Sequence, residues 1–552
     1  MEAVPTDVWG VVPPLDCADV SNSIWCGGYA IYWCLLIFRN AHKTFPDPLD
    51  DVLNFFMTIG SPALAAYSLQ ITHLNTRWLR KAFLHLEYPN SKAISTVIST
   101  FQHIPLQISP NPLLLPSLIV LPQNDAYWDL LLKCTERTRR WSIPLVMNFI
   151  WVIFPVLFTI IDSLHQERTA YAIVSIWTYL LPLIMGWLHV GCQPEPNHLR
   201  DCLDTANRIA WVATDQKDGP IQAIEIAGQL TQALKLAKDG ADVTEEDELR
   251  TSPVFNYSRT FTWSLKAQHI LSLVKNAAAK AERQIPVDNY GSGCDAVWVA
   301  GDHGGVAKEN RLGTNEQVID YCTEGTTPFE KVFRAPRPVV PPGHIFSRAP
   351  STPVALLPFY DSHNIRTPSR WASGVWTRVV FATLLALELQ WGGVGAAVMI
   401  NYKKRPYGLG CGALMFLVYG LAATVAFFLC LTSSVLAHIS RPQHGQPYRR
   451  SWTQTCLNGG AVLCGYLGRI LAVASGIGIL VLSSANYSGA FHSCYCASVT
   501  FNGGIRFHDV AYLPTIVDVG PKVIEVLIGG LGLAFSTAVL FGISIYLCTP
   551  PR

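Results

Sequence analysis

The sequence predicts an all-α membrane protein with about eight transmembrane helices in two groups of four, separated by a partly helical soluble insert. Three observations predict this class. Of the 552 residues, 50% are hydrophobic and only 14% are charged, whereas soluble proteins carry about 25% charged residues. The apolar residues gather in runs close to the roughly 20 residues that cross a bilayer. One long polar stretch, 191–370, separates two sets of such runs.

The N-terminal bundle is expected within residues 1–190. Its second run is uncharged but is interrupted by Gly60 and Pro62, and its last two runs are joined by a short polar turn that requires an antiparallel hairpin. The four expected spans are 24–38, 52–71, 143–161 and 169–190. A further run, 111–122, holds three prolines and is too short to cross a bilayer, so it is interpreted as an extended or interfacial segment.

The insert, 191–370, is predicted to be helical in its first half. Residues 221–240 place apolar side chains on one helical face and end at Gly240, and a second helix is expected at 258–284. From Ile285 onward the insert is rich in proline and glycine, which favours irregular structure.

The C-terminal bundle is expected within residues 371–552. Its four spans are 379–400, 408–437, 460–484 and 523–548. Small residues repeat every four positions in the last two of them, which indicates close helix packing. These residues are Gly468, Ala472 and Gly476, and then Gly530, Ala534, Ala538 and Gly542.

Loop charges and a glycosylation motif give an expected orientation. Basic residues are more frequent in the short loops on the side of the insert, which favours a cytoplasmic insert, although the Lys-Lys-Arg run at 403–405 lies on the other side. The opposite side then holds the acceptor sequence Asn-Tyr-Ser at Asn486 and the close cysteine pair Cys494 and Cys496, which suit an oxidising compartment. A second acceptor sequence, at Asn256, lies in the insert. We expect a multi-pass protein of the endoplasmic reticulum or plasma membrane, glycosylated at Asn486.

Composition and motifs also limit the partners. The net charge is +2, and no nucleic-acid-binding motif is present, so no nucleic-acid partner is expected. The 15 cysteines lack metal-ligand spacing, so neither a metal site nor a cofactor is predicted. The expected partners are the lipid bilayer and a lipophilic small molecule.

Glu388 is the candidate catalytic residue. It lies in the middle of the run 379–400, where an ionised carboxylate costs about 2.5–3.5 kcal/mol on insertion scales. Small residues that allow close helix approach follow it, so we expect Glu388 to face a helix contact and not lipid. They are Gly392, Gly393, Gly395, Ala396 and Ala397.

Three further residues are candidates for binding a substrate. Gln390 and Trp391 carry polar tips beside Glu388, and Arg469 is the charged residue of the span 460–484. A pair between Glu388 and Arg469 is possible if their helices are neighbours. The acid is thus either a proton donor or ligand in a functional site, or a structural partner of Arg469.

One segment carries a family resemblance. The run 385–420 contains Leu-Gln-Trp-Gly at 389–392 and Gly-Leu-Gly-Cys at 408–411, and Cys-Tyr-Cys follows at 494–496. The run resembles a segment of large polytopic membrane proteins of filamentous fungi, and the chain resembles the eight-span meroterpenoid cyclases of the ascofuranone and ascochlorin type. The resemblance implies a terpene cyclase of fungal secondary metabolism, and it assigns no catalytic residue.

Three functions are carried forward. The first is a membrane-embedded cyclase, an isomerase- or lyase-type enzyme, in which Glu388 protonates an epoxide or olefin of a prenylated substrate and aromatic faces stabilise the cation. The second is a transporter or channel with Glu388 and Arg469 along a polar path. The third is a scaffold or sensor without catalytic activity, whose insert docks a partner.

Overall fold

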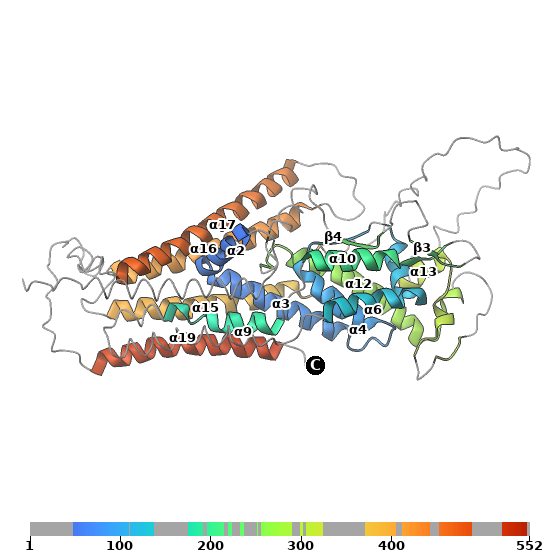
Figure 1. Ribbon diagram of the computed structural model, residues 1–552, viewed down its shortest axis with the longest axis horizontal. Coiled ribbons are helices and arrows are strands. Elements are labelled where there is room, and N and C mark those ends of the chain that lie inside the picture. Colours follow the sequence, from blue (N-terminus) through green and yellow to red (C-terminus); the bar gives the residue numbers. More distant parts are fainter. Residues whose placement is uncertain are drawn as a thin grey trace, which may run out of the picture.

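A computed structural model describes most of both bundles and much of the polar stretches. The residues described are 48–109, 111–136, 175–190, 196–214, 219–223, 232–236, 251, 255–289, 298–301, 305–323, 370–403, 411–441, 452–487 and 521–548. These residues are mostly helical, with almost no sheet. They form an elongated molecule, with a bundle of long helices at one end and a lobe of shorter helices at the other (Figure 1).

The bundle contains seven labelled helices among the described residues. They are α2 (Pro48–Gly60), α3 (Pro62–Phe83), α9 (Leu180–Val190), α15 (Val375–Lys403), α16 (Cys411–Ser440), α17 (Trp452–Tyr487) and α19 (Pro521–Cys548). The last four run alternately away from the lobe and back, so the helix ends at Ile439 and Leu547 lie at the lobe, where they accept hydrogen bonds from Arg370 and Arg77.

Four helices are long and apolar enough to cross a membrane: Val375–Tyr402, Gly412–Ser440, Trp452–Ser483 and Ile528–Leu547. They coincide with the four spans predicted for the C-terminal bundle. The predicted span 52–71 is instead broken into α2 and α3, which meet at a bend of 100° and together could make a fifth. The predicted span 169–190 contains the shorter apolar helix Ser175–Trp187, and 24–38 and 143–161 lie outside the described residues. The count of eight is therefore not confirmed.

Close helix contacts in the bundle follow the small-residue stripes. α15 packs against α3, α16 and α19, whereas α17 packs against α16 and α2. Gly468 lies against Ala426 and Cys430 of α16, Gly476 against Phe56 and Gly60, and Gly530 against Ile400 of α15. The predicted packing role is confirmed for these glycines, whereas Gly542 meets no neighbour within 4 Å.

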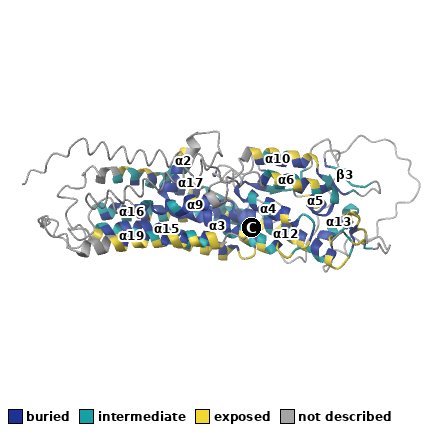
Figure 2. Ribbon diagram, turned by 60° about the horizontal axis from the view of Figure 1, so that its bottom comes forward, coloured by how far each residue is buried: buried dark blue, intermediate teal, exposed yellow. Residues whose placement is uncertain are grey.

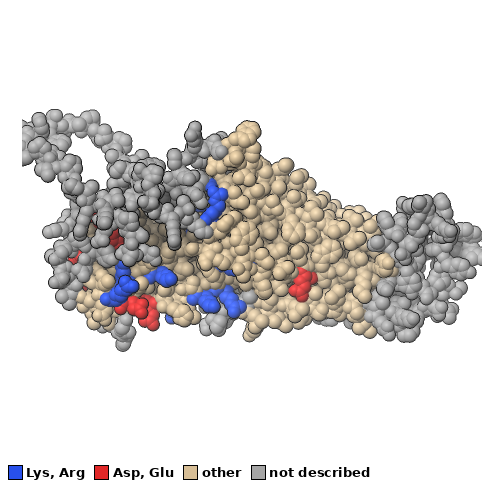
Figure 3. Space-filling model, turned by 180° about the vertical axis from the view of Figure 1, so that it is seen from behind, with Lys and Arg blue, Asp and Glu red and all other residues tan. Residues whose placement is uncertain are grey.

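The outer faces of the bundle are apolar. Large exposed hydrophobic side chains include Leu384, Ile470 and Tyr546, and exposed residues line α19 in Figure 2. Seen from behind, the bundle surface is almost free of charge, and the charged side chains gather toward the lobe (Figure 3). Such a surface suits contact with hydrocarbon.

The lobe is built from both polar stretches of the sequence around one hydrophobic core. Its helices are α4 (Ser91–Thr100), α5 (Leu114–Val120), α6 (Asp125–Glu136), α10 (Pro196–Arg208), α12 (Thr260–Glu282) and α13 (Asn315–Cys322), with short turns of 3₁₀ helix at η2 (Phe101–His103), η3 (Pro122–Asn124), η4 (Val287–Asn289) and η6 (Lys308–Arg311). Two antiparallel strand pairs join β1 (Leu106–Ile108) to β4 (Leu234–Leu236) and β2 (Trp211–Val212) to β3 (Ile221–Gln222). The stretch after α3 thus shares a core with the insert.

Of the two helices predicted in the insert, the structure confirms one. The helix expected at 258–284 is confirmed as α12. The helix expected at 221–240 is wrong at its described residues, because Ile221–Gln222 and Leu234–Leu236 are strands, and 224–231 and 237–240 lie outside the described residues. In the second strand Leu234 and Leu236 are buried and Lys235 is exposed, and pairing with β1 stabilises this alternation.

The run 111–122 is also not extended or interfacial, because it contains α5, whose seven residues are all buried in the lobe.

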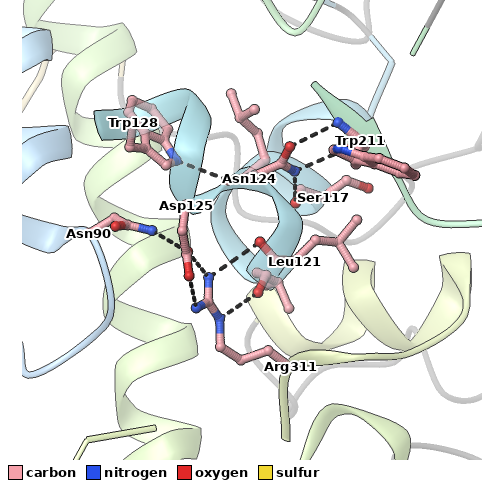
Figure 4. Close-up of polar contacts among 10 residues, drawn as sticks. Asn90, Ser117, Leu121, Asn124, Asp125, Trp128, Trp211 and Arg311 are labelled. Atoms are coloured by element: carbon pink, nitrogen blue, oxygen red, sulfur yellow. Dashed lines mark hydrogen bonds and ion pairs between the residues drawn. The ribbon is translucent and has the colours of Figure 1, made fainter. Parts of the chain in front are cut away.

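An ion pair between the buried Arg311 and the partly buried Asp125 joins elements of the lobe core (Figure 4). Arg311 of η6 donates from both terminal nitrogens to the Asp125 carboxylate, at 2.7 and 3.0 Å, and from Nε to the Val120 carbonyl at 2.8 Å. A further bond of 3.3 Å reaches the Leu121 carbonyl, and Asn90 donates to Asp125 at 2.6 Å. The arginine therefore binds the carbonyls of Val120 and Leu121 where α5 ends, and the Leu121 carbonyl also accepts the Asn124 N–H at 3.1 Å.

Asn124 makes a second connection beside this ion pair. Its Nδ2 donates to the Ser117 and Trp211 carbonyls at 2.9 and 3.0 Å, and its Oδ1 accepts the Trp211 N–H at 2.8 Å (Figure 4). Trp128 donates from its indole to the Leu118 carbonyl at 3.0 Å. These bonds tie α5 and α6, from the first polar stretch, to β2 of the insert.

Candidate functional site

The candidate site is the polar interior of the bundle. The four helices that are long and apolar enough to cross a membrane contain three charged residues, Arg378, Glu388 and Arg469, and each has different surroundings. A fourth polar feature is the break between α2 and α3.

The helix break follows from three consecutive residues, Gly60, Ser61 and Pro62. Proline supplies no N–H and restricts the residue before it to extended backbone, and Ser61 has φ −143° and ψ 81°. Gly60 allows the break to sit directly on α17, since a Cβ there would lie 1.6 Å from the Ala472 carbonyl oxygen. The sequence therefore fixes both the position of the bend and its close contact.

Side chains of α15 and α16 satisfy the backbone groups at the break. Gln390 Oε1 accepts the Ala63 N–H at 3.1 Å, and its Nε2 donates to the Gly420 carbonyl at 3.1 Å and to Thr424 Oγ1 at 2.8 Å. Trp391 Nε1 also donates to Thr424, at 3.2 Å. Gln390 is 1% exposed. Two of the three predicted substrate-binding residues therefore meet at Thr424, and Gln390 holds the first turn of α3 against α16.

Two more residues close the break, and the sequence analysis missed both. Ser61 Oγ donates to the Ala423 carbonyl at 3.0 Å, and the Tyr419 hydroxyl donates to the Ile59 carbonyl. The Gly-Ser-Pro sequence in an apolar run was the available signal for a break. Nothing in the sequence pairs that signal with α16, which lies more than 300 residues away.

Glu388 does not face a helix contact as predicted. It is only half-buried, and it shares a strip of α15 with the exposed side chains of Phe381, Leu384 and Met399. The helices α3, α16 and α19 cover the other sides of α15 and leave this strip open. Within the part of the chain that the structure describes, no hydrogen bond or ion pair reaches the Glu388 carboxylate.

Arg469 binds the insert and not Glu388. Its NH2 donates to Thr251 Oγ1 at 2.8 Å, and its Nε donates to the Tyr257 hydroxyl at 3.3 Å. The structure thus does not bring the acid and Arg469 together.

Residues 255–264 of the insert form a junction between lobe and bundle. Phe255, Tyr257 and Phe261 are buried in the bundle core, and Ser434 of α16 donates to the Tyr257 carbonyl at 2.7 Å. Asn256 is fully buried and donates to Thr72 and Gln102, at 3.4 Å each. The second acceptor sequence is therefore inaccessible to glycosylation in the folded protein.

Arg378, which the sequence analysis did not single out, lies at this junction. Its Cζ stacks 4.2 Å from the centre of the Trp78 ring of α3, and its NH2 donates to Ser264 Oγ of α12 at 3.3 Å. The side chain is 7% exposed, and among the described residues its Nε and NH1 have no hydrogen-bond partner. A basic residue near the start of an apolar run resembles an ordinary charge that flanks a span, so the sequence did not indicate that Arg378 is buried.

The remaining predicted site residue is Asn486, in the last turn of α17. Its glycosylation stays a prediction.

Comparison of the chain with protein-family models, with curated proteins and with solved structures finds no match. The proposals below therefore rest on the residues and their geometry.

Proposed function

We propose that the protein is a membrane-embedded cyclase that acts on a prenylated or epoxidised lipophilic substrate, with Glu388 as its acid. One observation carries the proposal: the carboxyl group lies mid-helix in a membrane-crossing segment, half-buried, with no hydrogen bond or ion pair to any described residue. The structural role that the sequence offered for Glu388 was pairing with Arg469, and Arg469 binds the insert instead. An intramembrane acid without a structural partner is a functional candidate.

The chemistry needs only this acid and an apolar surrounding. The protonated carboxyl gives its proton to an epoxide oxygen or olefin carbon, and a carbocation forms. An internal double bond attacks the cation and closes the ring, and a proton then leaves the product and restores the acid. Trp391, one helical turn from Glu388, offers an aromatic ring that can stabilise positive charge. The exposed strip around Glu388 suits a substrate that arrives from the bilayer.

The test is expression of the full chain in a microbial host, followed by incubation of its microsomes with prenylated-phenol epoxides. Glu388→Gln keeps the shape of the side chain but cannot donate an acidic proton, so we expect cyclised product to fall by about 100-fold or more. Glu309→Gln, at an exposed position of η6, is the matched control and should keep full activity. Product measured by chromatography and mass spectrometry decides the outcome. If the natural chain leaves every substrate unchanged, the proposed cyclase function is contradicted. If Glu388→Gln forms as much product as the natural chain, Glu388 is not the acid.

Transport is a second candidate because α2 and α3 are broken inside the bundle. Broken helices in membranes occur where backbone lines a substrate or ion path. In this chain Gln390 already occupies the first free donor of α3, so a transport cycle would have to release it. Proteoliposomes loaded with a proton or sodium gradient test this candidate. A leak that Gln390→Leu abolishes would support transport, whereas gradients held as in empty liposomes would exclude transport of these ions.

A further inference from the structure

Two cysteine side chains meet where α6 packs against α10 in the lobe. Cys134 lies near the C-terminal end of α6, and Cys202 lies in the middle of α10. A side-chain hydrogen bond joins the two thiols. Neither is in a disulfide, and Cys134 is partly exposed whereas Cys202 is buried. A reagent that reaches the lobe surface therefore meets Cys134 first, with a second thiol beside it.

A histidine of α10 lies against the buried thiol. The Cys202 Sγ lies 3.6 Å from Nδ1 and 4.0 Å from Nε2 of His198, which is exposed and precedes Cys202 by one helical turn. An imidazole beside a thiol can accept its proton and activate it as a nucleophile. The described residues hold no group of three His, Cys, Asp or Glu side chains arranged to bind a metal ion, so we consider the chemistry of the thiols themselves.

We propose that Cys134 and Cys202 form a reversible disulfide, with a small disulfide such as oxidised glutathione as the oxidant and His198 as the base. The Cys134 thiolate attacks one sulfur of the oxidant, forms a mixed disulfide and releases one thiolate. Cys202 then gives its proton to His198 and attacks the Cys134 sulfur, which releases the second thiolate. The imidazolium returns the proton to that thiolate. Two thiols of the chain become one disulfide, and the oxidant becomes two thiols.

The surroundings of Cys202 set the order of the two steps. Burial, followed by the hydrogen bond and the charge of Cys134, raises the pKa of the Cys202 thiol to about 12, and the charge of Asp201 acts in the same direction. Such a thiol reacts slowly with an external reagent. Once Cys134 carries the mixed disulfide its own contribution is lost, and His198 lies beside the thiol that must react next. Cys134 therefore reacts with the oxidant, and Cys202 resolves the intermediate.

The bond would join the two polar stretches of the sequence. Cys134 belongs to the first stretch and Cys202 to the insert, so a disulfide closes a loop of about 70 residues and lowers the entropy of the unfolded chain. The loop charges predict a cytoplasmic insert. Disulfides of cytoplasmic proteins are usually transient or redox-sensing, because glutathione and thioredoxin keep thiols reduced. The state of this pair would thus report the redox state of the compartment and decide whether α6 and α10 can separate.

The test exposes the reduced, purified full chain in detergent to an excess of oxidised glutathione and then digests it without reductant. Mass spectrometry identifies the peptides that are joined and the cysteines that carry glutathione. We expect Cys134 and Cys202 to be cross-linked in the natural chain, and an excess of reduced glutathione should reverse the bond. Cys456, exposed on α17, is the internal control and should carry glutathione. The proposal is overturned if Cys134 of the natural chain ends as anything other than this cross-link.

Two variants separate the roles of the three side chains. Cys202→Ser removes the resolving thiol, so glutathione should accumulate on Cys134, and an unmodified Cys134 would contradict the proposed order of attack. His198→Gln keeps both thiols and removes the base, so we expect the cross-link to form about tenfold or more slowly and to reach the same final yield. His85→Gln, at another exposed position of the lobe, is the matched control and should leave the rate unchanged. Equal rates in His198→Gln and the natural chain would show that His198 is not the base.

Discussion

The lobe and the junction each bury an arginine, and the two side chains differ in how fully they are bound. Arg311 in the lobe is 2% exposed, and all three of its guanidinium nitrogens donate to the Asp125 carboxylate or to the end of α5. Arg378 at the junction is 7% exposed, and one of its three nitrogens is bound. The two arginines are therefore similar in burial, and they differ in how many guanidinium nitrogens donate a hydrogen bond.

The same difference separates the polar groups of the bundle. Gln390 uses both ends of its amide to close the break between α2 and α3, as Asn124 does between α5 and β2 in the lobe. Glu388 and Arg378 have few or no partners, although unpaired charge is more costly in the membrane than in the lobe. Every polar side-chain atom of Arg311 and Asn124 in the lobe thus has a partner, whereas Glu388 and Arg378 of the bundle have few or no partners among the described residues.

Replacing Arg311 by leucine should give the largest effect. Among the described residues, the variant leaves the partly buried Asp125 carboxylate with the Asn90 amide as its donor, and it frees the Val120 carbonyl at the end of α5. Losing a hydrogen-bonded charged partner costs about 1.5–3 kcal/mol, and the Asp125 side chain, 32% exposed, keeps contact with water. Urea unfolding followed by tryptophan fluorescence measures the loss, with Lys308→Leu at an exposed position as control. If Arg311→Leu unfolds at the same urea concentration as the natural chain, the hydrogen bonds of Arg311 do not stabilise the lobe, and the proposed difference between Arg311 and Arg378 is contradicted.

The main helices could be predicted from sequence because hydrocarbon imposes a length and an apolar composition on each of them. The four C-terminal spans and the stripe at Gly468 and Gly476 needed no knowledge of distant contacts. The helix at 258–284 was also visible in local pattern.

The parts that failed depend on partners far away in sequence. Leu234 fits a helical period with Leu230 and Ala237 locally, and only pairing with Leu106 and Ile108 makes Leu234–Leu236 a strand. Gln390 could not be assigned to the break because Ala63 lies 327 residues away. Glu388 was predicted to face a helix contact because small residues follow it. Among the described residues, α3, α16 and α19 pack on other sides of α15, and Glu388 stays half-buried. Sequence identified the unusual groups, and tertiary structure decided which of them are satisfied.

Replacing Gly60 by alanine should give an intermediate effect, and it tests whether the break is a fixed joint. The added Cβ would lie 1.6 Å from the Ala472 carbonyl oxygen and 2.7 Å from the Gly476 nitrogen, so α2 and α17 must separate. Overpacking of this kind costs about 1–3 kcal/mol. Gly478→Ala on α17 is the control, because no atom lies within 4 Å of its new Cβ. Equal thermal stability of the two variants in detergent would show that α2 and α17 part easily, and the break would then be a hinge, as transport requires.

The smallest effect concerns thiol chemistry, and it compares the interior of the lobe with the surface of the bundle. Cys322 is fully buried in the lobe core, and burial raises the pKa of its thiol to about 12, with Lys280 nearby acting in the opposite direction. At pH 8 only about one thiol in ten thousand would be ionised, and the thiolate is the form that reacts. Cys456 on α17 is exposed. We therefore expect maleimide to label Cys456 in the folded chain and to reach Cys322 only in urea, as peptide mass mapping will show. Labelling of Cys322 at pH 8 without urea would mean that the lobe core opens readily, and the full binding of Arg311 would then not reflect a rigid lobe.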